Sequence, residues 1–209
     1  MTPESLQALA QLRSPDHFQW YVVTLLAVVI YAYVDTARRG EHGKVVLALA
    51  FWAGEFIWEM INALVLHFSG YSALWTTPGD SAFIIYVGLN IEISLMFGLA
   101  PLVLLNLLPA DRQLKILGIN NRLFLPIAVG LVCVLVESVL NAWGALAWAW
   151  PYWSWPHIEF IAVAYCLPFV LLAWLHDRWS MRARLMGLGV TVAGAVACHL
   201  VLAVWLRWS

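Results

Sequence analysis

The sequence predicts an all-α membrane protein, a bundle of six transmembrane helices that forms one integral membrane domain over residues 1–209. Composition is the first reason: 63% of the residues are apolar and 11% are charged, whereas a soluble domain is about half apolar and about a quarter charged. The second reason is six apolar runs that can each cross about 30 Å of hydrocarbon at about 1.5 Å per residue. These runs cover residues 18–36, 45–68, 82–108, 123–148, 157–175 and 185–206.

Each run is justified as a span by its content and its flanks. The first follows sixteen polar, weakly amphipathic residues without the pattern of a signal peptide, so we expect it to stay in the membrane. The second, third and fourth carry glutamate and asparagine, which spans tolerate where polar groups face the bundle interior. The fifth follows a segment rich in tryptophan and proline, as at a membrane interface. The sixth carries Gly187, Gly189 and Gly194 among alanines, which is typical of a close-packed helix.

The charges of the connecting segments predict the orientation. Nine of the eleven Lys and Arg residues lie in or beside the first, third and fifth connections, and none lies in the second or fourth. By the positive-inside rule, the odd-numbered connections are cytoplasmic and both termini lie outside. We expect a multi-pass protein of the plasma (inner) membrane. Since the net charge is −1 and no basic patch is present, the expected partners are the lipid bilayer and a lipophilic small molecule, with no nucleic acid.

The most informative residues are glutamates within these apolar runs. Glu55, Glu59, Glu92 and Glu137 lie inside runs, and Glu159 lies just inside the fifth run, so five of the twelve acidic residues are placed there. An ionisable side chain at bilayer depth costs at least about 2.5–3.5 kcal/mol, which makes it rare without a use. Since like charges in one low-dielectric region cannot all be ionised, we expect some of these carboxyl groups to carry a proton.

Helical spacing brings several of these polar groups together. Glu55, Glu59 and Asn62 follow i, i+4, i+7 spacing and share one face of the second helix. Glu137 and Asn141 share a face of the fourth helix for the same reason. Counted by helical rise, six polar residues fall between the midplane and the outer leaflet: Glu59, Asn62, Asn90, Glu92, Glu137 and Asn141.

The third and fifth runs add polar groups whose directions differ. Asn90 and Glu92 are two residues apart and therefore point about 200° apart, so they cannot both face one cavity. His157 and Glu159 are expected at the outer surface, where they would cap the polar region together with Asp80.

Aromatic residues are concentrated in the two outer segments. Four tryptophans occur within eight residues at 148–155, with Pro151 between them and Pro156 directly after them. Tryptophan anchors proteins at the membrane interface, and aromatic rings also stabilise an apolar or cationic ligand. We expect a pocket bounded by the second to fifth helices, roofed by Trp75, Trp153 and Trp155, with Trp58 beside Glu59.

Several interpretations of the glutamates stay open at this stage. Asn and protonated Glu stabilise helix–helix contacts by about 1 kcal/mol each. Alternatively, an enzyme could use one Glu as acid and another as base, or a transporter could carry protons or a cation on them. We expect no metal site and no cofactor, because no HExxH, P-loop, CxxC, GxSxG or dinucleotide-binding pattern is present. The three cysteines are expected to be packing residues.

Two short motifs add a resemblance. Trp58-Glu59 in the second run, followed by Gly88-Leu-Asn-Ile-Glu92-Ile in the third, resembles the small integral-membrane terpene cyclases of meroterpenoid pathways. Pro156-His-Ile-Glu159 is also similar to the Pro-x-x-Glu turn of membrane lycopene cyclases. The first family has seven spans and an acidic residue in its last helix, whereas this chain has six runs and no acid in the last.

The resemblance implies a metal-independent isomerase or lyase that protonates a prenyl chain and lets the carbocation cyclise or isomerise. It places the acids at Glu59 and Glu92, with Glu137 or Glu159 in place of the acid that the last helix lacks. The resulting hypothesis is an intramembrane enzyme for an isoprenoid-type substrate. Its alternative is a proton- or cation-coupled small transporter. The expected catalytic residues are Glu59, Glu92 and Glu137, and the expected substrate-binding residues are Glu55, Trp58, Asn62, Trp75, Asn90, Asn141, Trp153, Trp155, His157 and Glu159.

Overall fold

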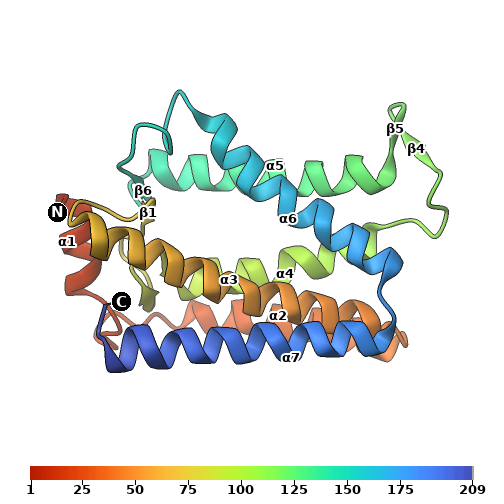
Figure 1. The fold of residues 1–209 in the computed structure, drawn as a ribbon, viewed down its shortest axis with the longest axis horizontal. Coiled ribbons are helices and arrows are strands. Elements are labelled where there is room, and N and C mark those ends of the chain that lie inside the picture. Colours follow the sequence, from red (N-terminus) through yellow and green to blue (C-terminus); the bar gives the residue numbers. More distant parts are fainter. Residues whose placement is uncertain (209) are drawn as a thin grey trace.

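The computed structural model describes residues 1–208, and most of its helices run along the long axis of the molecule (Figure 1). Three pairs of very short strands connect them. The helices are α1 (Pro3–Ala10), α2 (Tyr21–Arg38), α3 (His42–Ser69), α4 (Ile91–Leu107), α5 (Asn121–Ala142), α6 (Ile158–Arg178), α7 (Met181–Cys198) and the π-helix η1 (His199–Trp205). The strands are β1 (Trp75–Thr76), β2 (Ile84–Tyr86), β3 (Leu89–Asn90), β4 (Lys115–Ile116), β5 (Ile119–Asn120) and β6 (Ala147–Trp148).

Five helices of the described chain are long and apolar enough to cross a membrane, namely α2, α3, α5, α6 and the continuous stretch Met181–Trp205. α4 is apolar but shorter, with 17 residues. The outward faces are apolar too: Ile30, Tyr31 and Val190 are exposed. In a bilayer such faces contact lipid, while the helices satisfy their own backbone hydrogen bonds. The structure therefore agrees with the predicted helical, multi-pass class.

The predicted helix over 82–108 is wrong in its first part. β2 and β3 form an antiparallel hairpin, and α4 begins only at Ile91. Asn90 is the N-cap of α4, because its side-chain oxygen accepts a hydrogen bond from the backbone N–H of Ile93 at 2.8 Å. An apolar run with β-branched and aromatic residues is compatible with a strand as well as a helix, so hydropathy alone misplaces this boundary.

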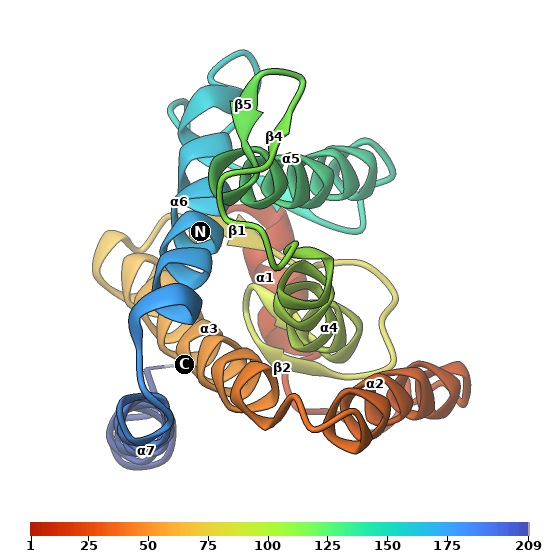
Figure 2. The same ribbon diagram turned by 90° about the vertical axis from the view of Figure 1, so that its right-hand side faces the viewer.

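The fourth run also differs from prediction in where its helix ends. α5 ends at Ala142, not at residue 148, because Gly144 adopts the left-handed conformation (φ 73°) and Ala147–Trp148 form β6. The sixth run packs closely along α3, as its glycines predict, but no residue of α7 is buried. α7 packs along α3 at the edge of the molecule (Figure 2).

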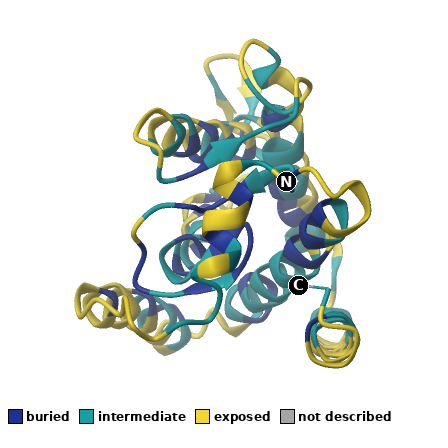
Figure 3. Cartoon of the chain, turned by 90° about the vertical axis from the view of Figure 1, so that its left-hand side faces the viewer, coloured by how far each residue is buried: buried dark blue, intermediate teal, exposed yellow. Residues whose placement is uncertain are grey.

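One end of the molecule carries both termini and joins the two aromatic connections (Figure 1). β1 pairs with β6 antiparallel, with Trp75 opposite Trp148. The N-terminal helix α1 lies across this end (Figure 3), and Ser5 Oγ lies 3.0 Å from Ser72 Oγ. On the neighbouring hairpin, Tyr86 Oη lies 2.8 Å from His199 Nδ1 of η1.

The opposite end carries the cationic connections and the β4–β5 hairpin (Figure 1). Asp177 at the end of α6 accepts hydrogen bonds from both Arg122 Nε (2.8 Å) and Arg122 Nη2 (3.2 Å) at the start of α5. This two-point contact fixes α5 against α6 at one end. Further along the pair, a Cβ on Gly130 would lie 2.9 Å from Cys166, so glycine allows the close crossing. All three cysteines are free.

Candidate functional site

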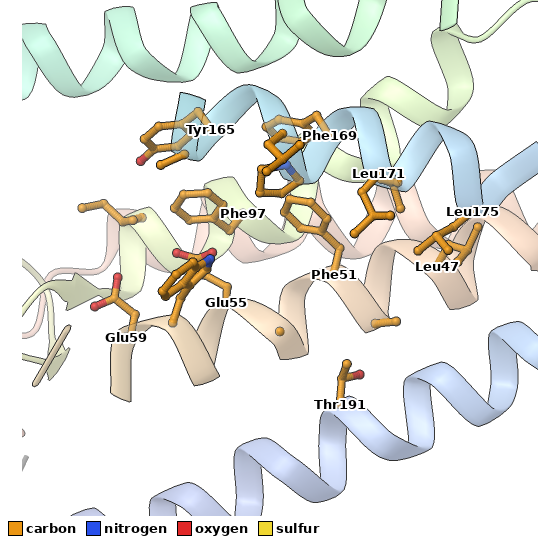
Figure 4. A pocket seen from close by; sticks show the side chains of 18 of the residues that line it. Leu47, Phe51, Glu55, Glu59, Phe97, Tyr165, Phe169, Leu171, Leu175 and Thr191 are labelled. Carbon is orange, nitrogen blue, oxygen red and sulfur yellow. The ribbon is translucent and has the colours of Figure 1, made fainter. Parts of the chain in front are cut away.

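A cavity of about 520 Å³ runs beside α3 and is the setting for the predicted glutamates. α3 lines it from Leu47 to Glu59, α6 lines the facing side from Ala164 to Leu175, and Gly187 and Thr191 of α7 complete a third side. Figure 4 shows carboxyl groups at one end of the cavity, and aromatic and aliphatic side chains along the rest. Its volume falls within the range of about 300–1,000 Å³ that is usual for small-molecule sites.

Three carboxyl groups lie at the end of the cavity nearer the termini. Glu55 and Glu59 come from successive turns of α3, and Glu137 comes from α5. Glu59 and Glu137 are only 1% and 5% exposed. The three groups interact electrostatically. The glutamates that were predicted on the polar faces of the second and fourth helices therefore meet in one site.

Glu59 has two differently placed oxygens. Trp75 Nε1 donates a hydrogen bond to Glu59 Oε1 at 3.0 Å. Glu59 Oε2 is buried and has no hydrogen-bond partner among the described residues. A buried carboxyl oxygen without a partner is costly, so Oε2 is a group in this site that needs a proton or a ligand.

Asn62 holds the segment that carries Trp75. Its Oδ1 accepts hydrogen bonds from the backbone N–H of Leu74 (2.8 Å) and of Trp75 (3.4 Å), and its Nδ2 donates to Trp75 O (2.8 Å). Asn62 is fully buried. It therefore acts on the site through Trp75, and it does not line the cavity itself.

Two of the predicted roof tryptophans close the carboxyl end. Trp75 and Trp153 stack with ring centroids 5.5 Å apart and planes 29° apart, and both line the cavity. Trp58 also lines it, with half of its surface exposed. Trp155 does not line it and is 61% exposed, so the predicted roof contains two tryptophans and not three.

Glu137 has a partner that sequence reasoning missed. Tyr165 of α6 donates its hydroxyl hydrogen bond to Glu137 Oε1. The Tyr165 ring stacks on Phe97 of α4, with centroids 5.9 Å apart. One turn further along α6, Phe169 stacks on Phe51 at 5.0 Å. The i, i+4 spacing of Tyr165 and Phe169 was a signal that they share one face of α6.

Glu92 lies elsewhere, although it was a predicted catalytic residue. It is in the first turn of α4, where it accepts hydrogen bonds from the hydroxyls of Tyr21 and Ser81 (2.8 Å from Ser81) and from the backbone N–H of Ala82 (2.9 Å). It does not line the cavity. The reason is the late start of α4, which places Glu92 against α2 and the preceding connection.

The other predicted binding residues are also outside the cavity. Asn90 caps α4. Asn141 donates a hydrogen bond to Leu146 O (3.1 Å) and lines a separate surface hollow of about 420 Å³. His157 Nδ1 lies 3.1 Å from Glu159 Oε1 on the surface. Within residues 1–208, no three His, Cys, Asp or Glu side chains are grouped to hold a metal ion; the absence of metal and cofactor stays a prediction.

Comparison with known proteins gives the family of the chain. A family model described as "Uncharacterized membrane protein family" matches residues 2–204. The chain belongs to this family. It is an integral, multi-pass membrane protein. An uncharacterized protein of Archaeoglobus fulgidus is 45% identical over 178 residues, which cover 84% of each chain. No solved structure matches. The family description names no reaction, so the resemblance to terpene cyclases stays a prediction.

Proposed function

We propose that the protein is an intramembrane enzyme that protonates a lipophilic, isoprenoid-type substrate and directs the cyclisation or isomerisation of the resulting carbocation. One observation carries the proposal. Glu59 lies at the closed end of an apolar cavity, with one oxygen held by Trp75 and the other buried without a partner. A carboxylic acid kept neutral in such a place can donate its proton.

Glu59 is the proposed acid. Oε2 gives its proton to one carbon of a double bond, whose π electrons form the new C–H bond and leave a cation on the neighbouring carbon. A second double bond of the same chain can attack this cation and close a ring. Trp75 keeps its hydrogen bond to Oε1 throughout and stabilises the carboxylate that forms.

Aromatic side chains are the proposed stabilisers of the cation. Trp75 and Trp153 stack above Glu59, while Phe97 and Tyr165 stack at the opposite wall. A cation over an aromatic face gains about 2 kcal/mol or more when water is absent. The remaining lining is largely aliphatic, which keeps water from trapping the cation.

Glu137 is the proposed base. The Tyr165 hydroxyl supports its anionic form by a hydrogen bond, and loss of a substrate proton to Glu137 restores a double bond. The product is then an isomer of the substrate, and no co-reactant is consumed. Glu55 interacts electrostatically with both Glu59 and Glu137, so it is placed to return the proton to Glu59. Glu92 has no part in this scheme.

The proposed setting is the plasma (inner) membrane, with six spans and both termini outside. α4 is the sixth proposed span. It has 17 residues, and the β2–β3 hairpin directly before it adds the remaining length across the bilayer. The placement of nine of eleven cations at the end opposite the termini supports this orientation. The carboxyl end of the cavity then lies in the outer half of the bilayer.

Mass spectrometry of lipid extracts tests the proposal, in cells that carry the gene, lack it, or carry Glu59→Gln. We expect an isoprenoid or quinone species to change with the gene, and Glu59→Gln to abolish the change, since the amide keeps the shape without the acidic proton. Glu159→Gln is the matched control, because Glu159 is exposed and outside the cavity. Identical lipids in all strains, together with a Glu59-dependent proton or cation flux in liposomes, would favour the transporter.

A further inference from the structure

We propose that the substrate enters this cavity sideways from the bilayer, through an opening between α6 and α7, and that the part that enters is an uncharged, unsaturated hydrocarbon chain. This inference rests on the proposed function for the reaction at Glu59 and adds the route and the class of substrate. It stands on three features: how α7 is packed, what closes the two ends of the cavity, and the charge of its lining.

The packing of α7 leaves one long side of the cavity without a covering helix. α7 packs along α3, and its contacts with α6 are few, although α6 and α7 are consecutive. Figure 2 shows α7 beside α3 and apart from α6. Both α6 and α7 nevertheless contribute residues to the cavity. α3 is therefore the floor, and α6 and α7 are the two rims of an opening.

The residues on the rims combine two properties. Leu167 and Leu171 of α6 line the cavity and yet are 64% and 51% exposed. On α7, Thr191 points towards the cavity (Figure 4). Its hydroxyl already donates to the backbone carbonyls of Gly187 and Leu188, each at 3.1 Å. The named rim residues thus expose apolar groups or a hydroxyl that is already hydrogen-bonded, and such a surface can contact lipid.

Tryptophans close the opening at both ends. Trp179, in the link between α6 and α7, packs on Gly187 so closely that a Cβ there would lie 2.6 Å from Trp179 Cζ3. The stacked Trp75 and Trp153 close the other end. The access between them therefore faces the middle of the helices, which is the hydrocarbon layer, and not either aqueous surface.

The charge and length of the cavity define what fits. Its lining contains Glu55, Glu59 and Glu137 but no Lys, Arg or His, so a phosphate or carboxylate inside it would find no cationic partner and would be repelled by any ionised glutamate. From Leu47 to Glu59 the α3 wall rises about 18 Å, slightly more than half of a hydrocarbon core of about 30 Å. A linear neutral chain matches this shape.

The test measures loading separately from reaction. Cys133, Cys166 and Cys198 are replaced by Ala, Leu171→Cys and Thr191→Cys are added, and the protein is placed in lipid nanodiscs. Two polyenes serve as probes: all-trans-retinol, which is neutral, and retinoic acid, which is anionic. Energy transfer from the protein's tryptophans to the bound polyene measures how much of each probe has entered the cavity. A bismaleimide that thiols can cleave then joins α6 to α7.

We expect retinol to load, retinoic acid to load at least tenfold less well, and the cross-link to slow retinol loading at least tenfold until it is cleaved. Equal loading with and without the cross-link would overturn the route, and equal loading of both probes would overturn the uncharged class. The same assay with Glu59→Gln, in which the proposed reaction cannot run, separates failure of loading from failure of chemistry.

A second pair of variants covers the case in which the cysteine protein does not fold. Leu167→Phe with Leu171→Phe narrows the opening, while Leu131→Phe with Leu135→Phe makes the same change at exposed α5 positions outside the cavity. Slower loading in the α6 double variant alone supports the route. Equal loading rates in the two double variants contradict it.

Discussion

At the scale of single residues, Gly88 sets how closely the β2–β3 hairpin approaches the partners of Glu59. A Cβ at Gly88 would lie 2.3 Å from Asn62 Nδ2 and 2.7 Å from the indole Cδ1 and Nε1 of Trp75. The requirement is for space, since the φ of Gly88 is not positive. Because Gly88 has no side chain, Asn62 can hydrogen-bond to the backbone of Trp75, and the Trp75 indole can hydrogen-bond to Glu59.

Replacing Gly88 by Ala should therefore displace Trp75 from Glu59. We expect a loss of about 1–3 kcal/mol in the free energy of unfolding, because the added methyl overpacks a filled site, together with a shift in tryptophan emission. Gly189→Ala is the control: its Cβ would have nothing within 4 Å, and alanine in a helix gains up to about 1 kcal/mol. Denaturant titration in detergent measures both, and an unchanged Gly88→Ala protein would refute the packing argument.

At the scale of elements, the α5–α6 pair depends on one carboxylate at the end opposite the termini. Asp177 and Arg122 are largely buried and meet at two points. Asp177→Asn should destabilise the protein by about 1.5–3 kcal/mol, since hydrogen bonds to charged groups contribute that much. Asp35→Asn breaks the exposed Asp35–Arg39 pair (3.0 Å) and should cost below about 1 kcal/mol. Thermal unfolding in detergent compares them; equal losses would contradict this ranking.

The spans and three of the site glutamates could be predicted from the sequence, whereas the partner of Glu137 could not. The positions of most spans follow from hydropathy, because lipid contact imposes it on every outward face. Glu55, Glu59 and Glu137 were found because a carboxyl group in such a span stands out. Tyr165 was missed because a tyrosine in an apolar helix carries no such signal, and its contact with Glu137 depends on how α5 crosses α6.

Glu92 shows the converse error. Its spacing from Asn90 was interpreted on a helix that in fact begins after Asn90. Hydropathy does not distinguish an apolar strand from an apolar helix. The pairing of β2 with β3, and therefore the first turn of α4, could not be located from composition.

At the scale of the whole molecule, the distribution of cations predicts accessibility from opposite sides of the membrane. In protein without Cys133, Cys166 and Cys198, we expect Tyr152→Cys to react with a membrane-impermeant maleimide in intact cells, because Tyr152 is exposed at the end of the termini. Gln113→Cys, exposed at the cationic end, should react only after lysis. The reverse pattern would invert the proposed orientation and the depth of the carboxyl groups with it.

The pairing of β1 with β6 has a consequence for how the protein is made. Trp75 lies opposite Trp148 and stacks on Trp153, and both of these residues leave the ribosome well after α3. During synthesis, Glu55 and Glu59 therefore enter the membrane before the indole stack and Tyr165 exist. A nascent chain that stops after α4 carries the acidic helix but no finished chamber. The parts that the proposed reaction needs are therefore together only after the second half of the chain has been made and has packed against the first.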